Sequence, residues 1–476
     1  MTEILKYFKE ISEIPRESGN EDGICKYLEE FAAKHNLEYH KDEYKNVIIK
    51  KEASAGYENS KTIILQGHTD MVCVKTAKSS HDFEKEGIEL VEESGYISGN
   101  QTSLGADNGI AIAYCLAILS NDKLKHPRLE VLLTSEEETT MGGAENLDPK
   151  YLDGKILINL DSEEEGIFLV SSAGGVEIGL KLPIKWDNLK DNYKSYRIKI
   201  KGLYGGHSGA DIDKGRANSN KLMGRLLEGI GSKMSMELSE INGGTKPNVI
   251  PGETIAIVSI PSEEEGKLVD LISTFKGIYK NEFKVSEPKL DISYKCLSKP
   301  VEKVLDDESA KKAIVLFNLL PHGVQTMSMD IEGLVESSCN FAIVETNGKS
   351  IDCMISVRSS VETLRDEVVT RIDMVSDVMG GSIDIQSPYP AWQYKESSYI
   401  RDLMINVYEN KYGEKPQIEA IHAGLECGMF DAKIDDLDAI SIGPNIHDAH
   451  TVNERIEIES ANKVYDYLLE VLSKIK

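Results

Sequence analysis

The sequence has few cysteines, no long apolar run and no excess of positive charge, and each absence excludes a class of protein. Its seven cysteines are widely spaced and form no CxxC pair, which argues against a disulfide scaffold and favours a reducing cytoplasm. The longest apolar run, residues 110–119, is about half the length needed to cross a bilayer, so we expect no membrane span. The first residues, MTEILKYFKEISEIP, lack the apolar core of a signal peptide, and we expect no export signal.

The charge is strongly acidic. Fifty-four basic and 80 acidic residues give a formal net charge of -26, which repels phosphate backbones and anionic lipids. We therefore expect neither nucleic acid nor a membrane as a partner. With 476 residues, 40% of them hydrophobic and 28% charged, the chain has the composition of a folded globular protein with two or three domains.

Strand and helix patterns alternate in the first third of the chain. Short apolar segments at 46–50, 62–66, 129–134 and 156–160 are typical of strands, and the apolar run at 109–119 is typical of a helix. This alternation predicts an α/β fold with a mainly parallel sheet.

The pattern changes after about residue 183, where amphipathic strands separated by helices indicate an antiparallel sheet. A proline-rich break near 387–392 ends this region. We therefore predict a discontinuous first domain made of residues 1–186 and 387–476, with an inserted α+β domain at 187–386.

Side chains that bind metals follow the ends of the predicted strands. In a parallel α/β sheet, ligands bind beyond the carboxyl ends of the strands. Histidine and carboxylate ligands suit zinc, manganese or cobalt, and this set is large enough for two ions if one carboxylate bridges them. The candidates are His68, Asp70, Asp107, Glu137, Glu138, Asp161 and His450.

Each motif taken alone also has an ordinary structural interpretation. The His68-Thr-Asp70 pattern is short and common, and Asp107 on its glycine-flanked turn could simply cap the helix that follows. The three consecutive glutamates 136–138 are more informative, because adjacent carboxylates after an apolar strand repel one another unless water or a cation compensates. One glutamate could bind a metal while its neighbour accepts a proton from water, which is hydrolytic machinery.

Seven motifs together resemble those of the aminoacyl-histidine dipeptidases, which are carnosinase-like Xaa-His dipeptidases. These belong to a family of di-metal metalloproteases that also includes glutamate carboxypeptidase. The matching segments run from about residue 10 to 460. The resemblance implies a di-metal peptidase catalytic domain, a lid formed by the inserted domain, and two divalent metal ions, zinc first and manganese or cobalt as alternatives. The motifs are GHTDMV, LGADNGIAIAY, LLTSEEETTMGGA, INLDSEEEG, GGHSGADI, HAGLECGMF and HDAHTVNE.

The resemblance also implies a role for each candidate ligand. His68 and Asp161 would hold one metal ion. Glu138 and His450 would hold the other, and Asp107 would bridge the two.

The remaining catalytic roles follow from the same motifs. Glu137 would be the general base, Asp70 would orient His68, and Glu136 would take no part. The family commonly has glycine at the position of Thr140, so we expect the turn after the glutamates to be shaped differently here.

The resemblance makes one prediction about the backbone. In this family the peptide bond after the bridging aspartate is cis, so we expect a cis bond between Asp107 and Asn108.

Five residues outside the ligand set resemble positions that lie near the substrate in this family. His207, Asn248 and Arg358 would contact the substrate from the lid, and arginine suits a carboxylate because its planar fork donates twice. Two simpler interpretations stay open: His207 as a loop histidine, and Arg358 in a surface ion pair. His422 and Glu426 resemble a substrate-side loop of the catalytic domain, with no ligand role derived for either.

The sequence thus predicts a cytoplasmic hydrolase that cleaves dipeptides, including Xaa-His dipeptides. The alternatives are a tripeptidase or an N-acyl amino acid deacylase of the same family, or a metal-binding protein without catalysis. The intact ligand set and Glu137 argue against the last of these. A homodimer stays open, because in several family members the counterpart of His207 reaches the substrate from the other subunit.

Overall fold

The computed structural model describes residues 2–476, which divide into two compact units. The first unit comprises the described residues up to Ser172 together with Trp392–Ala420 and Leu425–Lys476. The second unit comprises Ala173–Ala391 and the short segment Ile421–Gly424. The first unit is therefore discontinuous in sequence. Its role as a catalytic domain, and that of the second unit as a lid, stay predictions.

The second unit is longer at both ends than the predicted inserted domain. It begins at Ala173 and its main segment ends at Ala391, whereas the predicted domain spans residues 187–386. The reason is strand pairing, since β9 (Gly174–Pro183) pairs with β18 (Ser350–Ser359) and with β19 (Ser382–Tyr389) in the sheet of the second unit. The pairing places both β9 and β19 in that unit.

The first unit is built on an eight-stranded sheet in the order β1-β2-β6-β3-β7-β21-β8-β20. Its centre is parallel: β3 (Ile63–His68) lies between β6 (Leu129–Thr134) and β7 (Ile156–Asn159), and β21 (Asp438–Ser441) continues on the far side of β7. Every residue of β3, β6 and β7 is buried, as expected for strands covered on both faces. The predicted α/β fold is confirmed. The predicted mainly parallel sheet is parallel at its centre, whereas the outer pairs β1–β2, β2–β6 and β21–β8 are antiparallel.

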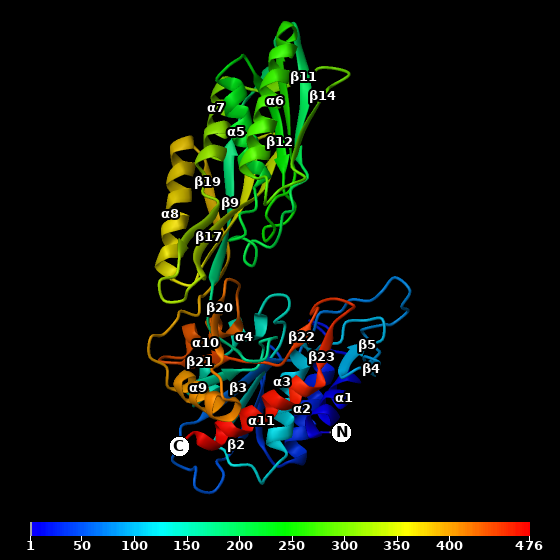
Figure 1. Cartoon of the computed structure of the whole chain (residues 1–476), viewed down its shortest axis with the longest axis vertical. Coiled ribbons are helices and arrows are strands. Elements are labelled where there is room, and N and C mark those ends of the chain that lie inside the picture. The colour runs from blue at the N-terminus through cyan, green and yellow to red at the C-terminus, as the bar shows by residue number, and fades with distance from the viewer. Residues whose placement is uncertain (1) are drawn as a thin grey trace. The chain divides into compact units, whose positions relative to one another are not determined.

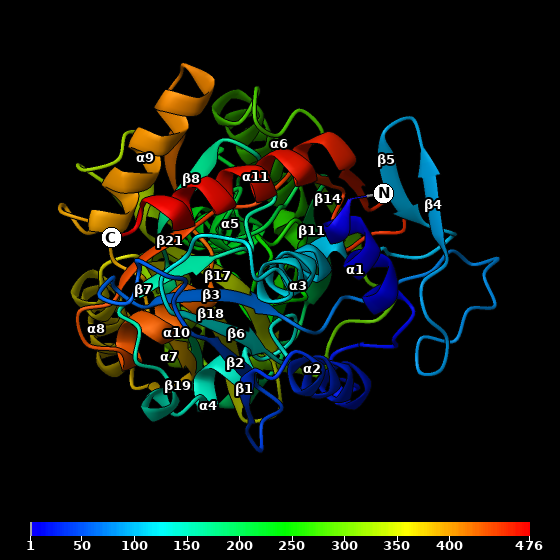
Figure 2. The same cartoon turned by 90° about the horizontal axis from the view of Figure 1, so that it is seen from below.

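Helices lie on both sides of the central strands (Figure 2). The most buried of them is α3 (Ala106–Leu119), in which every residue is buried, so its apolar sequence needs no polar face. It packs against β3 and is covered by α1 (Glu3–Ser12) and α11 (Ile458–Lys474). The packing fixes the start of α3 beside the end of β3.

The second unit is built on an antiparallel sheet in the order β14-β11-β13-β12-β17-β18-β9-β19, with β16 paired to β17 (Figure 1). Burial alternates along β9: Leu180 and Leu182 are buried, whereas Lys181 between them is exposed. This alternation is typical of a sheet with one covered face. The helices α5, α6, α7 and α8 pack against the sheet and form one apolar core with it.

The remaining elements have the following bounds. In the first unit they are α2 (Asp22–Lys34), β1 (Glu38–Lys41), β2 (Val47–Lys51), β4 (Leu90–Glu93), β5 (Tyr96–Gly99), α4 (Gly142–Asn146), β8 (Ile167–Ser172), α9 (Tyr399–Tyr412), β20 (Gln417–Ile421), α10 (Glu426–Lys433), β22 (Ile446–His447) and β23 (Arg455–Glu457). In the second unit they are β10 (Trp186–Asn188), β11 (Tyr193–Lys201), α5 (Ser219–Gly231), β12 (Glu237–Gly243), β13 (Thr254–Pro261), α6 (Glu265–Glu282), β14 (Asp291–Cys296), β15 (Lys303–Leu305), α7 (Asp307–Leu319), β16 (Gly323–Met327), β17 (Val335–Thr346) and α8 (Glu362–Met379). Among residues 2–476, no helix combines the length and the apolar character that a membrane span requires.

Candidate active site

The first unit brings all the predicted ligand residues together at the carboxyl ends of its central strands. His68 is the last residue of β3, and its Nδ1 lies 3.1 Å from the carbonyl oxygen of Asp70. A carbonyl oxygen only accepts, so Nδ1 carries a hydrogen. Nε2 is then the nitrogen that donates to the carboxylates when the ring is protonated, or that could bind a metal ion when the ring is neutral. That Nε2 lies 3.0 Å from Asp107 Oδ1 and 3.4 Å from Asp161 Oδ1.

Asp70 joins the end of β3 to the turn that carries the glutamates. Its carboxylate accepts the backbone N–H groups of Glu137 and Glu138, at 3.0 and 3.2 Å, and the hydroxyl of Ser18 at 2.7 Å. Burial favours the neutral form of Asp70, but His68 and these hydrogen bonds outweigh it and lower the pKa of Asp70 to about 2. Asp70 therefore stays ionised and fixes the position of both glutamates.

Asp107 lies at the start of α3, and the peptide bond between Asp107 and Asn108 is cis, as predicted. Its Oδ1 faces His68, and its Oδ2 lies 2.9 Å from Nε2 of His450. Burial opposes ionisation, but the hydrogen bonds from His450 and His68 hold the pKa of Asp107 far below its usual range. One carboxylate thus presents a separate oxygen to each histidine, which is the arrangement that a bridging ligand needs.

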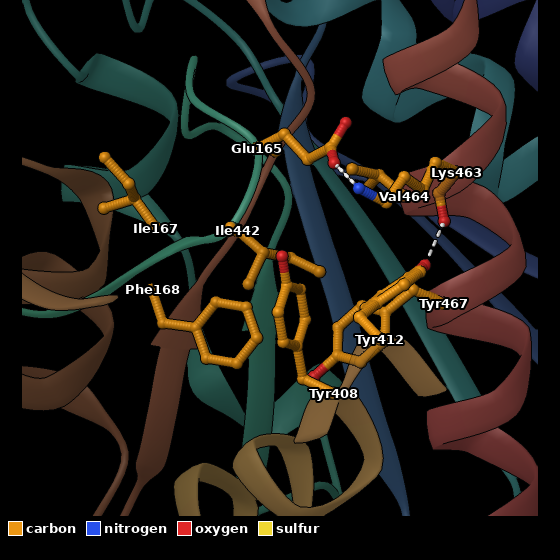
Figure 3. A pocket seen from close by; sticks show the side chains of 11 residues that line it. Glu165, Ile167, Phe168, Tyr408, Tyr412, Ile442, Lys463, Val464 and Tyr467 are labelled. Atoms are coloured by element: carbon orange, nitrogen blue, oxygen red, sulfur yellow. Dashed lines mark hydrogen bonds and ion pairs between the residues drawn. The ribbon is translucent and has the colours of Figure 1, made fainter. Parts of the chain in front are cut away.

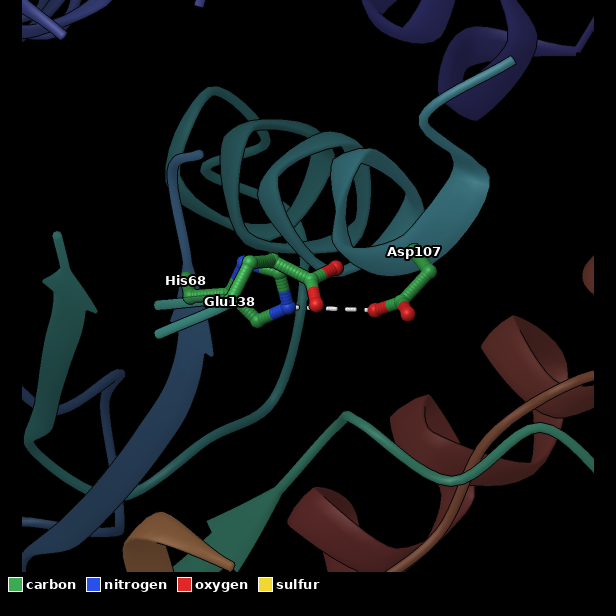
Figure 4. Close-up of side chains that lie close together, drawn as sticks. All are labelled: His68, Asp107 and Glu138. Carbon is green, nitrogen blue, oxygen red and sulfur yellow. Dashed lines mark hydrogen bonds and ion pairs between the residues drawn. The ribbon is translucent and has the colours of Figure 1, made fainter. Parts of the chain in front are cut away.

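Glu138 and Asp161 complete the cluster. Glu138 Oε1 lies 3.0 Å from His450 Nε2, and ligand atoms of His68, Asp107 and Glu138 all lie within 4.8 Å of one another (Figure 4). Asp161 follows β7, and its buried Oδ1 has no hydrogen-bond partner. Burial and the charges of Asp107 and Glu138 raise the pKa of Asp161 to about 7, although His68 opposes the shift.

These observations fit a pair of divalent cations. Three carboxylates and two imidazoles share one small volume, one carboxylate oxygen lacks a partner, and the mixture of nitrogen and oxygen donors is one that zinc accepts. Positive ions would compensate the repulsion among the carboxylates.

The structure separates the three consecutive glutamates. Glu138 faces His450, whereas Glu136 turns away and accepts a hydrogen bond from the hydroxyl of Thr140 at 3.1 Å. Burial raises the pKa of Glu137, and the charges of nearby carboxylates, Asp161 first among them, add to the shift while His68 opposes it. Glu137 is therefore a half-buried residue whose carboxyl group lies next to the cluster.

The turn after these glutamates does not need the glycine that the family commonly has. Positive φ angles occur at Glu136 (55°) and Met141 (53°), and Thr140 is not among the residues with positive φ. Threonine therefore fits its position without backbone strain.

Glu426 was given no role from the sequence, yet it is a buried neighbour of this cluster. Its Oε2 accepts hydrogen bonds from Gln66 Nε2 at 2.5 Å and Thr134 Oγ1 at 2.8 Å, and its Oε1 has no partner. Burial raises the pKa of Glu426 to about 8, against the effect of His68. In the sequence, the one sign that Glu426 lies near the site is its position in the HAGLECG motif.

The sequence suggested that His422 lies in a loop of the catalytic domain, but in the structure it belongs to the second unit. The segment Ile421–Gly424 leaves the first unit for four residues, and His422 Nε2 lies 2.7 Å from Ser338 Oγ on β17. Burial, reinforced by the charge of Arg358, lowers the pKa of His422 to about 4, so the ring is neutral at neutral pH.

His207 lies in the same unit with one ring nitrogen free. Its Nδ1 accepts the backbone N–H groups of Gly209 and Ala210 at 3.2 and 3.1 Å. The neutral ring therefore carries its hydrogen on Nε2, which is left to donate. Burial, and after it the charge of Arg358, lowers the pKa of His207.

Arg358, on β18, forms no salt bridge among residues 2–476, and its contact is with a tyrosine, so the structure does not support the interpretation as a surface ion pair. Its Nη1 donates to the hydroxyl of Tyr389 at 2.9 Å, and its buried Nε has no partner. Asn248 is exposed, and its backbone carbonyl oxygen accepts a hydrogen bond from the backbone N–H of Ser208 at 2.9 Å. The second unit therefore holds a group of hydrogen-bond donors suited to an anion.

A separate pocket of the first unit contains none of the predicted residues (Figure 3). It is lined by Phe168 and three tyrosines, and Lys463 lies 4.7 Å from the centre of the Tyr412 ring. Lys463 also forms an ion pair with Glu165, so the charged groups at this pocket are already paired.

Comparison with known proteins places this geometry in a family. The model of peptidase family M20/M25/M40 matches residues 64–474. The chain belongs to this peptidase family. The chain is 34% identical over 474 residues to the cytosol non-specific dipeptidase of Escherichia coli K12, covering 98% of this chain and 96% of the relative.

Solved structures of the family agree. The aminoacylhistidine dipeptidase of Vibrio alginolyticus superimposes with a TM-score of 0.94 at 34% identity, covering 99% of this chain and 96% of that one. The aminopeptidase PepT of Bacillus cereus shares the fold, with a TM-score of 0.57 at 15% identity over 99% of this chain and 98% of that one. This M20-family chain is thus a metal-dependent peptide-bond hydrolase.

Proposed function

We propose that this M20-family chain is a dipeptidase that cleaves dipeptides, Xaa-His dipeptides among them. The observation that carries the proposal is the geometry of Asp107, whose two carboxylate oxygens face His68 and His450, with Glu137 beside them. The two relatives at 34% identity, named as a non-specific dipeptidase and an aminoacylhistidine dipeptidase, support the same substrate class.

The cluster in the first unit would hold two divalent cations, with zinc as the ion that the donor set favours and manganese or cobalt as alternatives. His68 and Asp161 would hold one ion, Glu138 and His450 would hold the other, and Asp107 would bridge the two. When bound, the ions polarise the carbonyl of the scissile peptide and lower the pKa of a water molecule.

Glu137 moves the proton. It lies next to Glu138 in sequence, and Asp70 holds the backbone N–H groups of both at about 3 Å, so its position relative to the cluster is fixed. Its carboxylate accepts the proton of the attacking water and delivers it to the amine that leaves.

The donors of the second unit bind the rest of the substrate. Arg358 recognises the free carboxylate of the dipeptide with its guanidinium, and Asn248 and His422 assist it. His207, with its hydrogen on Nε2, stabilises the oxyanion that forms at the carbonyl. A requirement for a free carboxylate would select against peptides whose C-terminus is blocked, such as dipeptide amides.

Two further statements belong to the proposal. The enzyme acts in the cytoplasm, which the name of the Escherichia coli relative and the unpaired cysteines support. The dipeptide is its ligand, without nucleic acid or membrane partners, and a homodimer stays a prediction.

A substrate panel tests the proposal. The zinc-loaded enzyme is offered free dipeptides including β-alanyl-histidine, tripeptides and N-acetyl amino acids, with a Glu137→Ala preparation as the control for contaminating peptidases. Free dipeptides should give the highest kcat/KM. Faster turnover of tripeptides or N-acetyl amino acids would overturn the dipeptidase assignment in favour of the tripeptidase or deacylase alternative.

A further inference from the structure

Two oppositely charged side chains, Arg16 and Glu454, are buried beside the turn that carries Asp107 and take no part in the proposed chemistry. Each is only 2% exposed. Burial of a charge is unfavourable unless hydrogen bonds compensate it, so a buried charge is expected where its contacts are specific.

Glu454 binds the backbone at the start of α3. Its Oε2 accepts the N–H groups of Leu104 and Gly105 at 2.8 and 3.0 Å. Its Oε1 accepts those of Ala106 and Asp107 at 2.7 and 3.4 Å. The first N–H groups of a helix have no partner within the helix, and no side chain at the preceding position caps this one. A single carboxylate therefore fixes four consecutive peptide units, including that of Asp107.

Arg16 binds the same turn from its carbonyl side. Its Nη2 donates to the carbonyl oxygen of Gly105, and its Nη1 donates to the carbonyl oxygens of Thr69 and Asp70 at 3.1 and 2.9 Å. A Cβ atom at Gly105 would lie 2.5 Å from Nη2, so glycine makes room for the guanidinium. Gly105 is thus held through its carbonyl by Arg16 and through its N–H by Glu454.

We infer that Arg16 and Glu454 are positioning residues that set the distances between the metal ligands of the site. The ligands come from five separate segments, and three of these carry His68, Asp107 and His450. Arg16 ties the residues directly after His68 to the Asp107 turn, and Glu454, four residues after His450, ties that turn to the third segment. Metal sites require their ligands to be held to within about 0.5 Å, and residues that orient ligands affect affinity for the metal. The inference rests on the proposed metal site.

The matched control for Glu454 is Glu130, on β6. Glu130 is also a fully buried glutamate of the first unit, and its Oε2 accepts the backbone N–H groups of Asp153 and Gly154 at 2.9 and 3.0 Å. It lies near the start of β6, whereas the glutamates of the site follow the end of that strand. Both Glu454→Gln and Glu130→Gln weaken contacts to backbone N–H groups, and Glu130→Gln also weakens ion pairs with Lys50 and Arg128. Only Glu454 is linked to the metal ligands.

The test is a zinc titration of metal-free protein for the wild type and both variants, with thermal unfolding in chelator as the measure of folding. Glu454→Gln should weaken zinc binding about 10- to 100-fold. Glu130→Gln should leave the zinc affinity unchanged, even where it lowers the Tm as much. Equal zinc affinity in Glu454→Gln and wild type, or equal weakening in both variants, would overturn the inference.

Arg16→Lys provides a second test should Glu454→Gln fail to fold. Lysine keeps the charge but cannot donate to three carbonyl groups from a planar fork. Weaker zinc binding supports the inference, and unchanged binding overturns it. Failure of the wild-type protein to bind zinc would instead refute the proposed metal site itself.

Discussion

The two units hold polar clusters of opposite character. In the first unit, carboxylates and imidazoles face one another at about 3 Å, so most of their polar atoms are already paired before any ligand binds. In the second unit, Arg358 Nε and His422 Nδ1 are buried without a partner. The first cluster is preorganised by its own contacts and by the backbone around it, whereas the second leaves donors for a ligand to satisfy.

The difference shows what each unit requires from its sequence. The first cluster combines three carboxylates with two imidazoles, and bound cations would relieve the repulsion among the carboxylates. Asp70 fixes the turn that carries Glu137 and Glu138. The second consists of neutral histidines around one guanidinium, because burial and Arg358 lower the pKa of His207 and of His422. One cluster suits metal ions and the other suits a carboxylate.

The largest effect should come from Glu137→Ala, which removes the proposed base without removing a ligand. The kcat should fall about 10²- to 10⁴-fold, while the zinc content stays that of the wild type. Glu136→Ala is the matched control, because Glu136 points toward Thr140 and away from the cluster. Loss of both metal ions in Glu137→Ala, or near-normal turnover, would show that the roles of the glutamates are assigned wrongly.

A smaller loss should follow from His207→Ala, which would remove a donor that acts on the oxyanion. We expect kcat to fall on the order of 10²-fold, with KM and metal content little changed. His207→Gln keeps a donor at this position and should recover part of the loss. A change in KM alone would place His207 in ground-state binding instead.

Arg358→Ala should act on KM. We expect KM for free dipeptides to rise about 10- to 100-fold, because a charged hydrogen-bonding pair is lost, and to change far less for dipeptide amides. Arg365→Ala is the control, since Arg365 is paired with Asp366 in the same unit. Equal effects of Arg358→Ala on free and amidated dipeptides would show that Arg358 does not recognise the carboxylate.

The smallest effect is a pH dependence confined to the second unit. Burial, and after it the charge of Lys221, lowers the pKa of His322 to about 3, and burial lowers that of His422 to about 4. In the unfolded chain both would titrate near 6.5. The unfolded state therefore binds more protons below pH 6.5, and the stability present at neutral pH is lost as the pH falls from about 6.5 toward 4.

Thermal unfolding followed by Trp186 fluorescence, in a Trp392→Phe background, tests this dependence, because Trp186 is then the one tryptophan left. The Tm should fall between pH 7.5 and pH 4.5, and His322→Asn should make the fall shallower. His35→Asn, in the first unit, should leave it unchanged. An equally steep fall in His322→Asn would rule out His322 as a cause.

The ligand cluster could be predicted from the sequence because local patterns determine it. Each ligand follows an apolar strand or precedes an apolar helix, and parallel strands bring their carboxyl ends to one edge. The family motifs then assigned the role of base to Glu137 and no role to Glu136. In the structure Glu136 points toward Thr140 and away from the cluster.

What could not be predicted depends on contacts between distant segments. β9 pairs with strands more than a hundred residues further along the chain. Its own sequence therefore could not predict which of the two units it belongs to. The four residues around His422 change unit without any change in composition. Arg16 and Glu454 meet the Asp107 turn from opposite ends of the chain, and an isolated charge gives no sign of being buried.

In the proposed peptidase centre, the first unit would bind two metal ions and Asp107 would bridge them. Zinc titrated into the metal-free enzyme, with hydrolysis of a free dipeptide followed at each step, tests it most directly. We expect no turnover without metal, and a rise in turnover that reaches its plateau at two equivalents of zinc. Full turnover by the metal-free chain, or a plateau at one equivalent, would contradict it.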